Sequence, residues 1–295
     1  MKIPRSIQAD LALLAVTFVW GSTFTIVKQS LALISPILFV AMRFWVAAAL
    51  TLSLMPGQIQ KISKRSLWRG LGLAAVLSGG FIFQTLGLRS TSPSNSAFIT
   101  SLSVILVPLL GFLLFRQKPA PQVILGVALA TLGLFLLLVD ISDLRIQAGD
   151  ILTFVCAILF GLQILLLSRF LTKIEYAQLL LLQVLGSAVF CTLLVPVVER
   201  PFIFWNLDLA LYLFITGVLA TAGAFYVQAR AQRLTTPNRA ALIFSLEPFF
   251  AALFAYWILD HMLSPKEWVG GILVLSGILV SEMQFSRRSQ VSTCQ

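Results

Sequence analysis

Two ionisable side chains lie deep inside long apolar stretches of the chain, where they could act on a polar solute. Arg43 is about eight residues into the run 35–55, and Glu247 is about nine residues into the run 238–259. At about 1.5 Å per residue, both positions approach the middle of a membrane-spanning helix. A charge there costs about 2.5 kcal/mol or more, so it usually faces a cavity or a partner. We expect Arg43 to bind a carboxylate, and Glu247 to bind an amine or a proton. The alternatives are a structural ion pair, or snorkelling of either side chain toward an interface.

Amide and aromatic side chains lie at a similar depth and are candidates for the same polar path. Gln84 and Gln228 occupy equivalent places in an internal repeat, and Gln183 is the repeat partner of Arg43. Such residues also serve as interhelical hydrogen bonds worth about 0.6–2 kcal/mol, and deep aromatic residues also serve as core. Because polar side chains avoid lipid, we expect one central cavity with a substrate-binding set of eight residues: Trp20, Arg43, Gln84, Gln163, Gln183, Tyr226, Gln228 and Glu247.

These residues belong to a chain of 295 residues in which only 11% are charged. A soluble domain has about 25% charged residues, so the composition excludes a disordered chain, a coiled coil and an ordinary soluble enzyme. A net charge of +10 would suggest nucleic acid in a soluble protein, but here the charges lie between apolar runs and set orientation in a membrane. The three cysteines form no disulfide or metal pattern, and there is no P-loop motif. We therefore expect no metal, no cofactor and no nucleic-acid partner.

The elements that must position the polar residues are apolar runs separated by polar or Gly/Pro turn signals. A crossing of the bilayer core needs roughly 20 apolar residues. If the N-terminus is inside, 15 of the 21 basic residues fall in cytoplasmic segments and 5 fall on the other side. This bias predicts that both termini are cytoplasmic. We also expect the protein to lie in the inner (plasma) membrane. Ten runs fit the pattern: 9–27, 35–55, 67–87, 94–115, 121–139, 150–169, 177–197, 208–229, 238–259 and 265–284.

The second half of the chain repeats the first. At a constant spacing of 144, 15 of the 56 positions from Gly79 to Leu134 are identical to their partners, which indicates a duplication. Asp10 to Gly21 matches Asp150 to Gly161 at a spacing of 140. Each half holds five runs, an odd number, so the halves cross the membrane in opposite directions. We predict an all-α membrane protein of ten transmembrane helices as two inverted five-helix repeats, 1–145 and 146–286, with a cytoplasmic tail at 287–295.

Glycines and prolines inside the runs predict local features of the helices. Two pairs of glycines recur at a spacing of seven, near one helix face, where they let helices approach closely. They are Gly126, Gly133, Gly270 and Gly277. Pro108 and Pro248 should kink the helices that contain them.

The residues resemble those of the drug/metabolite transporter superfamily, specifically the EamA-type ten-helix carriers. The resemblance covers nearly the whole chain. It rests on Trp20-Gly21, Arg43-Phe44, Asn95 to Ile99, Pro108, Gln122-x-x-x-Gly126 to Gly133, Glu247 to Ala252, Leu263-Ser264-Pro265, and Trp268-x-Gly270 to Gly277. The Gly-Glu-Arg turn usual in that family is replaced by Phe115-Arg116-Gln117-Lys118 and Leu259-Asp260-His261-Met262.

The resemblance implies a secondary transporter, an exporter of amino acids or similar small metabolites that works by alternating access. Its partners are then the lipid bilayer, a small-molecule substrate and, as a candidate coupling ion, the proton. A membrane-embedded enzyme is the alternative from another class, but the single histidine, His261, falls in an outer loop and no run holds a His/Asp/Glu cluster. A channel or lipid scramblase is a third interpretation, and saturable flux with counterflow would distinguish a carrier from it.

Overall fold

The computed structural model describes residues 4–138, 147–259 and 265–282. Within these ranges the secondary structure is helical apart from one isolated bridge between Ile34 and Ile203. The helices are α1 Arg5–Ser30, α2 Pro36–Leu54, the 3₁₀ helix η1 Pro56–Lys61, α3 Lys64–Leu88, α4 Pro93–Ser101, α5 Ser103–Phe115, α6 Pro121–Leu138, α7 Ala148–Leu171, α8 Tyr176–Val198, α9 Leu207–Phe214, the π-helix η3 Ile215–Gly223, α10 Ala224–Ala231, α11 Pro237–Phe244, α12 Glu247–Leu259 and α13 Pro265–Glu282. The all-helical prediction is confirmed. The predicted tail 287–295 and the loop that contains His261 lie outside the described residues.

Local sequence explains where several helices begin. Proline occupies the first turn of α2, α4 and α11. The N–H groups of a first turn have no acceptor within the helix, so the missing N–H of proline costs no hydrogen bond there. The Ser92 hydroxyl accepts from the N–H of Asn95 at 3.0 Å, and the Thr236 hydroxyl accepts from that of Arg239 at 3.3 Å. These caps satisfy N–H groups that a helix start leaves unpaired. The turn signals Ser92-Pro93 and Thr236-Pro237 therefore mark true helix starts.

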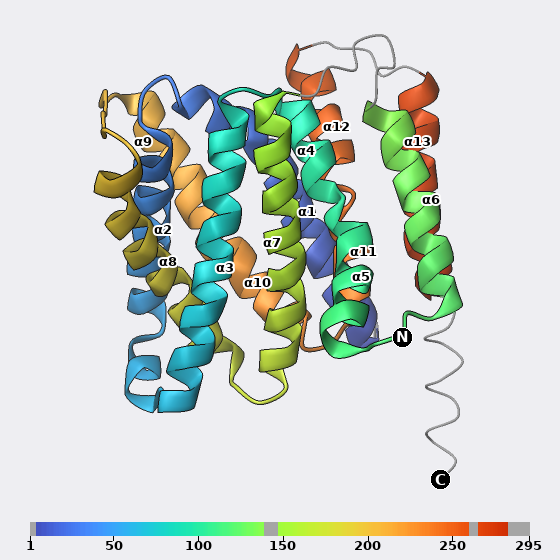
Figure 1. Ribbon diagram of the computed structural model, residues 1–295, viewed down its shortest axis with the longest axis horizontal. Coiled ribbons are helices and arrows are strands. Elements are labelled where there is room, and N and C mark those ends of the chain that lie inside the picture. The colour runs from blue at the N-terminus through green and yellow to red at the C-terminus, as the bar shows by residue number, and fades with distance from the viewer. Residues whose placement is uncertain (1–3, 139–146, 260–264, 283–295) are drawn as a thin grey trace.

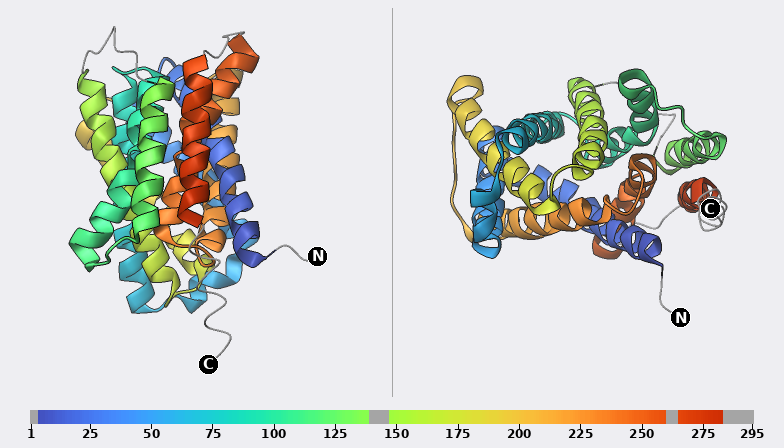
Figure 2. Two further views of the ribbon diagram at one scale, coloured as in Figure 1. Left: turned by 90° about the vertical axis from the view of Figure 1, so that its right-hand side faces the viewer. Right: turned by 90° about the horizontal axis from the view of Figure 1, so that it is seen from below.

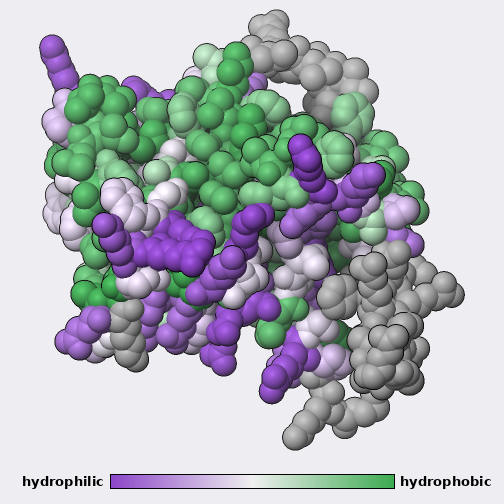
Figure 3. Space-filling view, turned by 60° about the horizontal axis from the view of Figure 1, so that its bottom comes forward, coloured by the Kyte–Doolittle hydropathy of each residue, from purple (hydrophilic) through white to green (hydrophobic). Residues whose placement is uncertain are grey.

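The helices have the length and surface of a membrane protein. Seven helical segments are long and apolar enough to cross a bilayer: Arg5–Ser30, Pro36–Leu54, Lys64–Leu88, Pro93–Phe115, Ala148–Leu171, Tyr176–Val198 and Leu207–Ala231. Two shorter apolar helices, Pro121–Leu136 and Trp268–Ser281, accompany them. Large apolar side chains such as Leu113, Leu125 and Leu193 are exposed on the flanks. Hydrophilic side chains gather at the end of the molecule where α1 begins, below an apolar flank (Figure 3).

The helices form an elongated bundle with α6 and α13 at one side (Figures 1 and 2). On the opposite side, α2 packs against α8 and η3, and α3 packs against α7 and α8. The helix α1 contacts α10, α11 and α12. Residues from α1, α2, α3, α7 and α10 therefore surround the middle of the bundle.

The close packing predicted for the glycines is confirmed between α6 and α13. A Cβ atom added to Gly126 would lie 2.6 Å from the carbonyl oxygen of Gly277, and one added to Gly133 would lie 2.5 Å from that of Gly270. Both distances are shorter than any van der Waals contact, so the two backbones can approach this closely only where side chains are absent.

Two long helical segments are broken near their middle. One break falls at Leu102, between α4 and α5, and the other at Ser245 and Leu246, between α11 and α12 (Figure 1). The second break lies just before Pro248, whose ring would clash with the carbonyl of the residue four positions earlier. The first break differs from the prediction, because Pro108 stays inside α5 and the interruption comes six residues before it.

Candidate functional site

A cavity opens in the middle of the bundle, with roughly 630 Å³ of unfilled space when its mouth is included. Nine helices contribute to its wall: α1, α2, α3, α4, α5, α7, α10, α11 and α12. The lining residues are Trp20, Thr23, Phe24, Val27, Arg43, Leu77, Phe81, Gln84, Leu88, Thr100, Ser103, Phe160, Gln163, Ile164, Phe225, Gln228, Phe244 and Glu247.

Six of the eight predicted site residues line this cavity: Trp20, Arg43, Gln84, Gln163, Gln228 and Glu247. The other two lie elsewhere. Gln183 is wholly buried in α8, and neither of its amide atoms has a partner among the described residues. The Tyr226 hydroxyl accepts from a guanidinium N–H of Arg230 at 3.2 Å, and its ring packs 5.9 Å from that of Tyr176.

The Arg43 side chain is held in one orientation by the helix opposite. Its Nε donates to the hydroxyl of Thr221 at 2.6 Å, and its Nη2 donates to the carbonyl of Ala220 at 3.4 Å. The guanidinium carbon lies 4.4 Å from the centroid of the Phe81 ring, within cation–π distance. With 3% of its surface exposed, Arg43 presents a fixed positive charge to the cavity.

The partner atoms of Arg43 come from the π-helix η3, a feature that the sequence did not indicate. In η3 the N–H of Ala224 donates to the carbonyls of Leu219 and Thr221. The Ala220 carbonyl lies between these acceptors, and it accepts from the indole N–H of Trp20 at 2.8 Å. The hydroxyl of Thr221 also donates to the Thr216 carbonyl at 2.7 Å. A π-helical turn therefore supplies a carbonyl and a hydroxyl to two cavity residues, and π-bulges frequently occur at functional sites.

The negative charge of the cavity is positioned by the break between α11 and α12. Glu247 is the first residue of α12, where the exposed N–H groups of the helix start favour a carboxylate. The approach of α1 to this point depends on Gly21, since a Cβ there would lie 2.8 Å from the Glu247 carbonyl oxygen. Electrostatic attraction acts between Glu247 and Arg43. The cavity wall thus contains one basic and one acidic side chain.

The remaining wall is formed by aromatic, aliphatic and hydroxyl side chains and by three amides. The Trp20 ring packs 5.5 Å from Phe225 and 5.1 Å from Phe244, and Phe81 packs 5.2 Å from Phe160. The Gln228 amide donates to the Gln163 carbonyl oxygen at 3.3 Å. The Gln84 amide donates to the Thr100 hydroxyl at 3.4 Å. Such a surface can hold an apolar body and a few polar groups at the same time.

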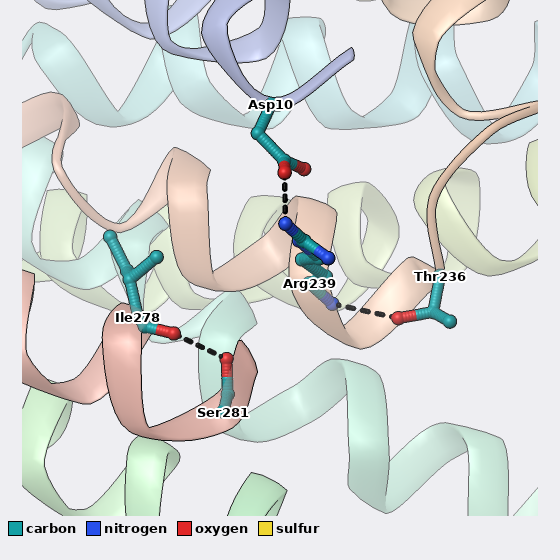
Figure 4. A network of polar contacts seen from close by, with 5 residues as sticks. All are labelled: Asp10, Thr236, Arg239, Ile278 and Ser281. Carbon is teal, nitrogen blue, oxygen red and sulfur yellow. Dashed lines mark hydrogen bonds and ion pairs between the residues drawn. The ribbon is translucent and has the colours of Figure 1, made fainter. Parts of the chain in front are cut away.

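Polar contacts join both ends of α1 to neighbouring segments. At its start, Asp10 and Arg239 form an ion pair between α1 and α11, beside the Thr236 cap (Figure 4). At its other end, the Lys28 ammonium donates to the carbonyls of Leu88, Arg89 and Thr91 in the α3–α4 link. The helix that carries Trp20 is therefore anchored on both sides of the cavity.

Comparisons with known proteins agree with this architecture. The model of the EamA-like transporter family matches the chain twice, at residues 7–139 and 147–283. An uncharacterised transporter of Archaeoglobus fulgidus is 33% identical, over 95% of this chain and 87% of its own length. An uncharacterised transporter of Bacillus subtilis is 26% identical, over 92% of each chain. A solved crystal structure superimposes with a TM-score of 0.77 at 17% identity, covering 95% of this chain and 98% of that one, and so shows the same fold.

Proposed function

Since this chain belongs to the EamA-like transporter family, we propose that it is a secondary carrier that exports amino acids or similar small metabolites by alternating access. The observation that carries this proposal is the central cavity, whose wall contains Arg43, Glu247 and several aromatic rings. A zwitterion with an apolar side chain complements these features, with its carboxylate toward Arg43 and its ammonium toward Glu247.

We propose ten membrane crossings, arranged as inverted repeats over 1–145 and 146–286. The packing pairs support this arrangement, because exchanging the halves maps the contact of α3 with α7 onto that of α10 with α1. It also maps the contact of α5 with α7 onto that of α12 with α1, and leaves the pairs α2 with α8 and α6 with α13 unchanged. The two breaks fall at equivalent positions, Leu102 and Leu246, at the same spacing of 144 as the sequence repeat.

The cavity wall itself supports the inverted repeat. Most of its residues form equivalent pairs, one from each half: Trp20 with Phe160, Thr23 with Gln163, Phe24 with Ile164, Phe81 with Phe225, Gln84 with Gln228, Thr100 with Phe244, and Ser103 with Glu247. Inverted-repeat carriers build their binding sites at the interface of the two halves. A site composed of such pairs fits that plan.

The proposed orientation places both termini in the cytoplasm and the protein in the plasma (inner) membrane. The hydrophilic end in Figure 3 is the one where α1 begins, and it is the end predicted to be cytoplasmic from loop charge. Reporter fusions at both ends of the chain should each report the cytoplasm. A periplasmic signal from the C-terminal fusion would mean that the number of crossings is odd.

Alternating access requires that either end of the cavity can close. The Asp10–Arg239 pair joins α1 and α11 at the end proposed to be cytoplasmic. The lining extends the other way, through Val27 and Leu88, toward the end where Lys28 contacts the α3–α4 link. We propose that these contacts exchange during transport.

The experiment that tests the carrier uses purified protein in proteoliposomes with radiolabelled neutral amino acids. Saturable uptake with counterflow is the expected result, and loss of binding in Arg43→Gln would follow from the loss of the carboxylate partner. If Glu247 carries a coupling proton, Glu247→Gln should remove the dependence on a proton gradient and spare counterflow. Flux that does not saturate would instead indicate a channel.

A further inference from the structure

We propose that Gln163 and Gln228 form a subsite that recognises an uncharged carboxamide group on the transported molecule. This inference rests on the proposed function and names the substrate class that the cavity selects. Its basis is an unusual pair of amides on facing helices, α7 and α10, in the wall described above.

Each amide uses only one of its two polar atoms in bonding to the other. Gln163 and Gln228 are 2% and 1% exposed, and a single hydrogen bond of 3.3 Å joins the Gln228 Nε2 to the Gln163 Oε1. The Gln163 Nε2 and the Gln228 Oε1 are buried and have no partner among the described residues. Exchanging the oxygen and nitrogen of both amides would again leave one NH₂ group and one oxygen, so this result does not depend on how the amides are assigned.

Three other polar side chains in the wall have partners within the protein. The Arg43 guanidinium bonds to Thr221, the Trp20 indole to Ala220, and the Gln84 amide to Thr100. A buried polar atom without a partner is unfavourable, so a ligand group that pairs with Gln163 and Gln228 would gain binding energy there. Both side chains line the cavity, and between them they carry one unpaired donor and one unpaired acceptor.

A carboxamide is the group that satisfies both. Its oxygen can accept from the Gln163 NH₂, and its own NH₂ can donate to the Gln228 oxygen. A carboxylate would place a negative oxygen against the Gln228 oxygen, and an ammonium would place a donor against the Gln163 NH₂. A methyl group would leave both protein atoms unpaired, which is how sites built for hydrogen bonding reject apolar analogues.

The test compares glutamine, glutamate and norleucine, which share one head group and differ in the end of the side chain. Binding to purified wild-type protein is measured by calorimetry. We expect glutamine to bind about tenfold or more tighter than either analogue. In the double variant Gln163→Leu, Gln228→Leu the order of glutamine and norleucine should reverse, while norleucine still binds. Gln183→Leu, which removes a buried amide outside the cavity, is the matched control and should keep the wild-type order.

A second probe separates this inference from the proposed function. Phenylacetamide and phenylacetate lack the amino-acid head group but fit an aromatic wall with a terminal amide or acid. If no amino acid binds but phenylacetamide stabilises the wild type against heat and not the double variant, the subsite stands and the amino-acid proposal is wrong. Equal affinity for glutamine and norleucine, an unchanged preference in the double variant, or no effect of any probe would overturn the carboxamide subsite.

Discussion

The substitution Thr221→Val tests whether the π-helix η3 holds Arg43 in place. Valine has nearly the shape of threonine but cannot accept from the Arg43 Nε, which lies 2.6 Å from the hydroxyl. It also loses the 2.7 Å bond to the Thr216 carbonyl. A hydrogen bond to a charged group contributes about 1.5–3 kcal/mol and a neutral one about 0.5–1.5 kcal/mol. Thr221 is fully buried and Arg43 almost so, so water cannot readily replace either bond.

We therefore expect Thr221→Val to lower the free energy of unfolding by about 2–4 kcal/mol. At about 2–4 °C per kcal/mol, the melting temperature should fall by at least about 4 °C. Thermal unfolding in one detergent, followed by intrinsic fluorescence, provides the measurement. Thr221→Ser keeps the hydroxyl and removes one methyl group, so it should cost only about 1 kcal/mol.

Thr51→Val is the matched control for loss of a buried hydroxyl. Thr51 is 3% exposed, and its hydroxyl donates at 2.8 Å to the Ala47 carbonyl of its own helix. No charged group depends on it for a hydrogen bond, so we expect a change below about 1 kcal/mol. Equal destabilisation by Thr221→Val and Thr51→Val would refute the conclusion that Thr221 fixes Arg43. If Thr221→Ser lowered the free energy of unfolding as much as Thr221→Val, that result would refute the conclusion as well.

Five further substitutions test other parts of the structure by thermal or denaturant unfolding. Gly133→Ala would bring a Cβ to 2.5 and 2.8 Å from backbone atoms of α13, so it should destabilise by about 1–3 kcal/mol. Gly72→Ala is the control: no atom lies within 4 Å of its new Cβ, so it should stabilise the protein by up to about 1 kcal/mol. Similar effects of Gly133→Ala and Gly72→Ala would contradict the close α6–α13 packing. Arg43→Gln and Glu247→Gln should each destabilise the protein, and the double change should cost less than the sum of the two. Strict additivity would show that the two charges are independent. Arg116 has a left-handed backbone with a φ of 54°, so Arg116→Gly should stabilise by about 1 kcal/mol, and a loss of stability would mean that its side chain matters more than its backbone.

The helices were predictable from the sequence because the signals for them are local. An apolar run must bury its backbone polar groups in a helix, and a Ser-Pro or Thr-Pro pair marks its start. The break at Leu102 was not predictable in the same way. Pro108 stays within α5, so a proline alone does not locate an interruption six residues away.

The site residues were predictable only from their depth within the apolar runs. Depth selected six residues that line the cavity, but it says nothing of the direction in which a side chain points around its helix. Gln183 has the right depth and faces the packed interior around α8 instead. Thr221 and the Ala220 carbonyl were missed because neither is an unusual residue in an apolar run. Their role depends on a π-helical turn that only the folded chain defines.

The cavity combines a symmetric wall with an asymmetric arrangement of charge. The repeat supplies aromatic residues at equivalent places in both halves, such as Trp20 with Phe160 and Phe81 with Phe225. The two charges break this symmetry, because the repeat partner of Arg43 is Gln183, outside the cavity, and that of Glu247 is the small, neutral Ser103. A symmetric cavity would accept a zwitterion equally well in two opposite orientations. With a basic residue held by η3 and an acidic residue at the start of α12, a zwitterion of the proposed kind would bind in a single orientation, and its side chain would lie against the same part of the wall at each binding event. A subsite at Gln163 and Gln228 requires such a fixed orientation. The amide pair can select a carboxamide only if binding of the head group places the end of the substrate side chain beside the pair.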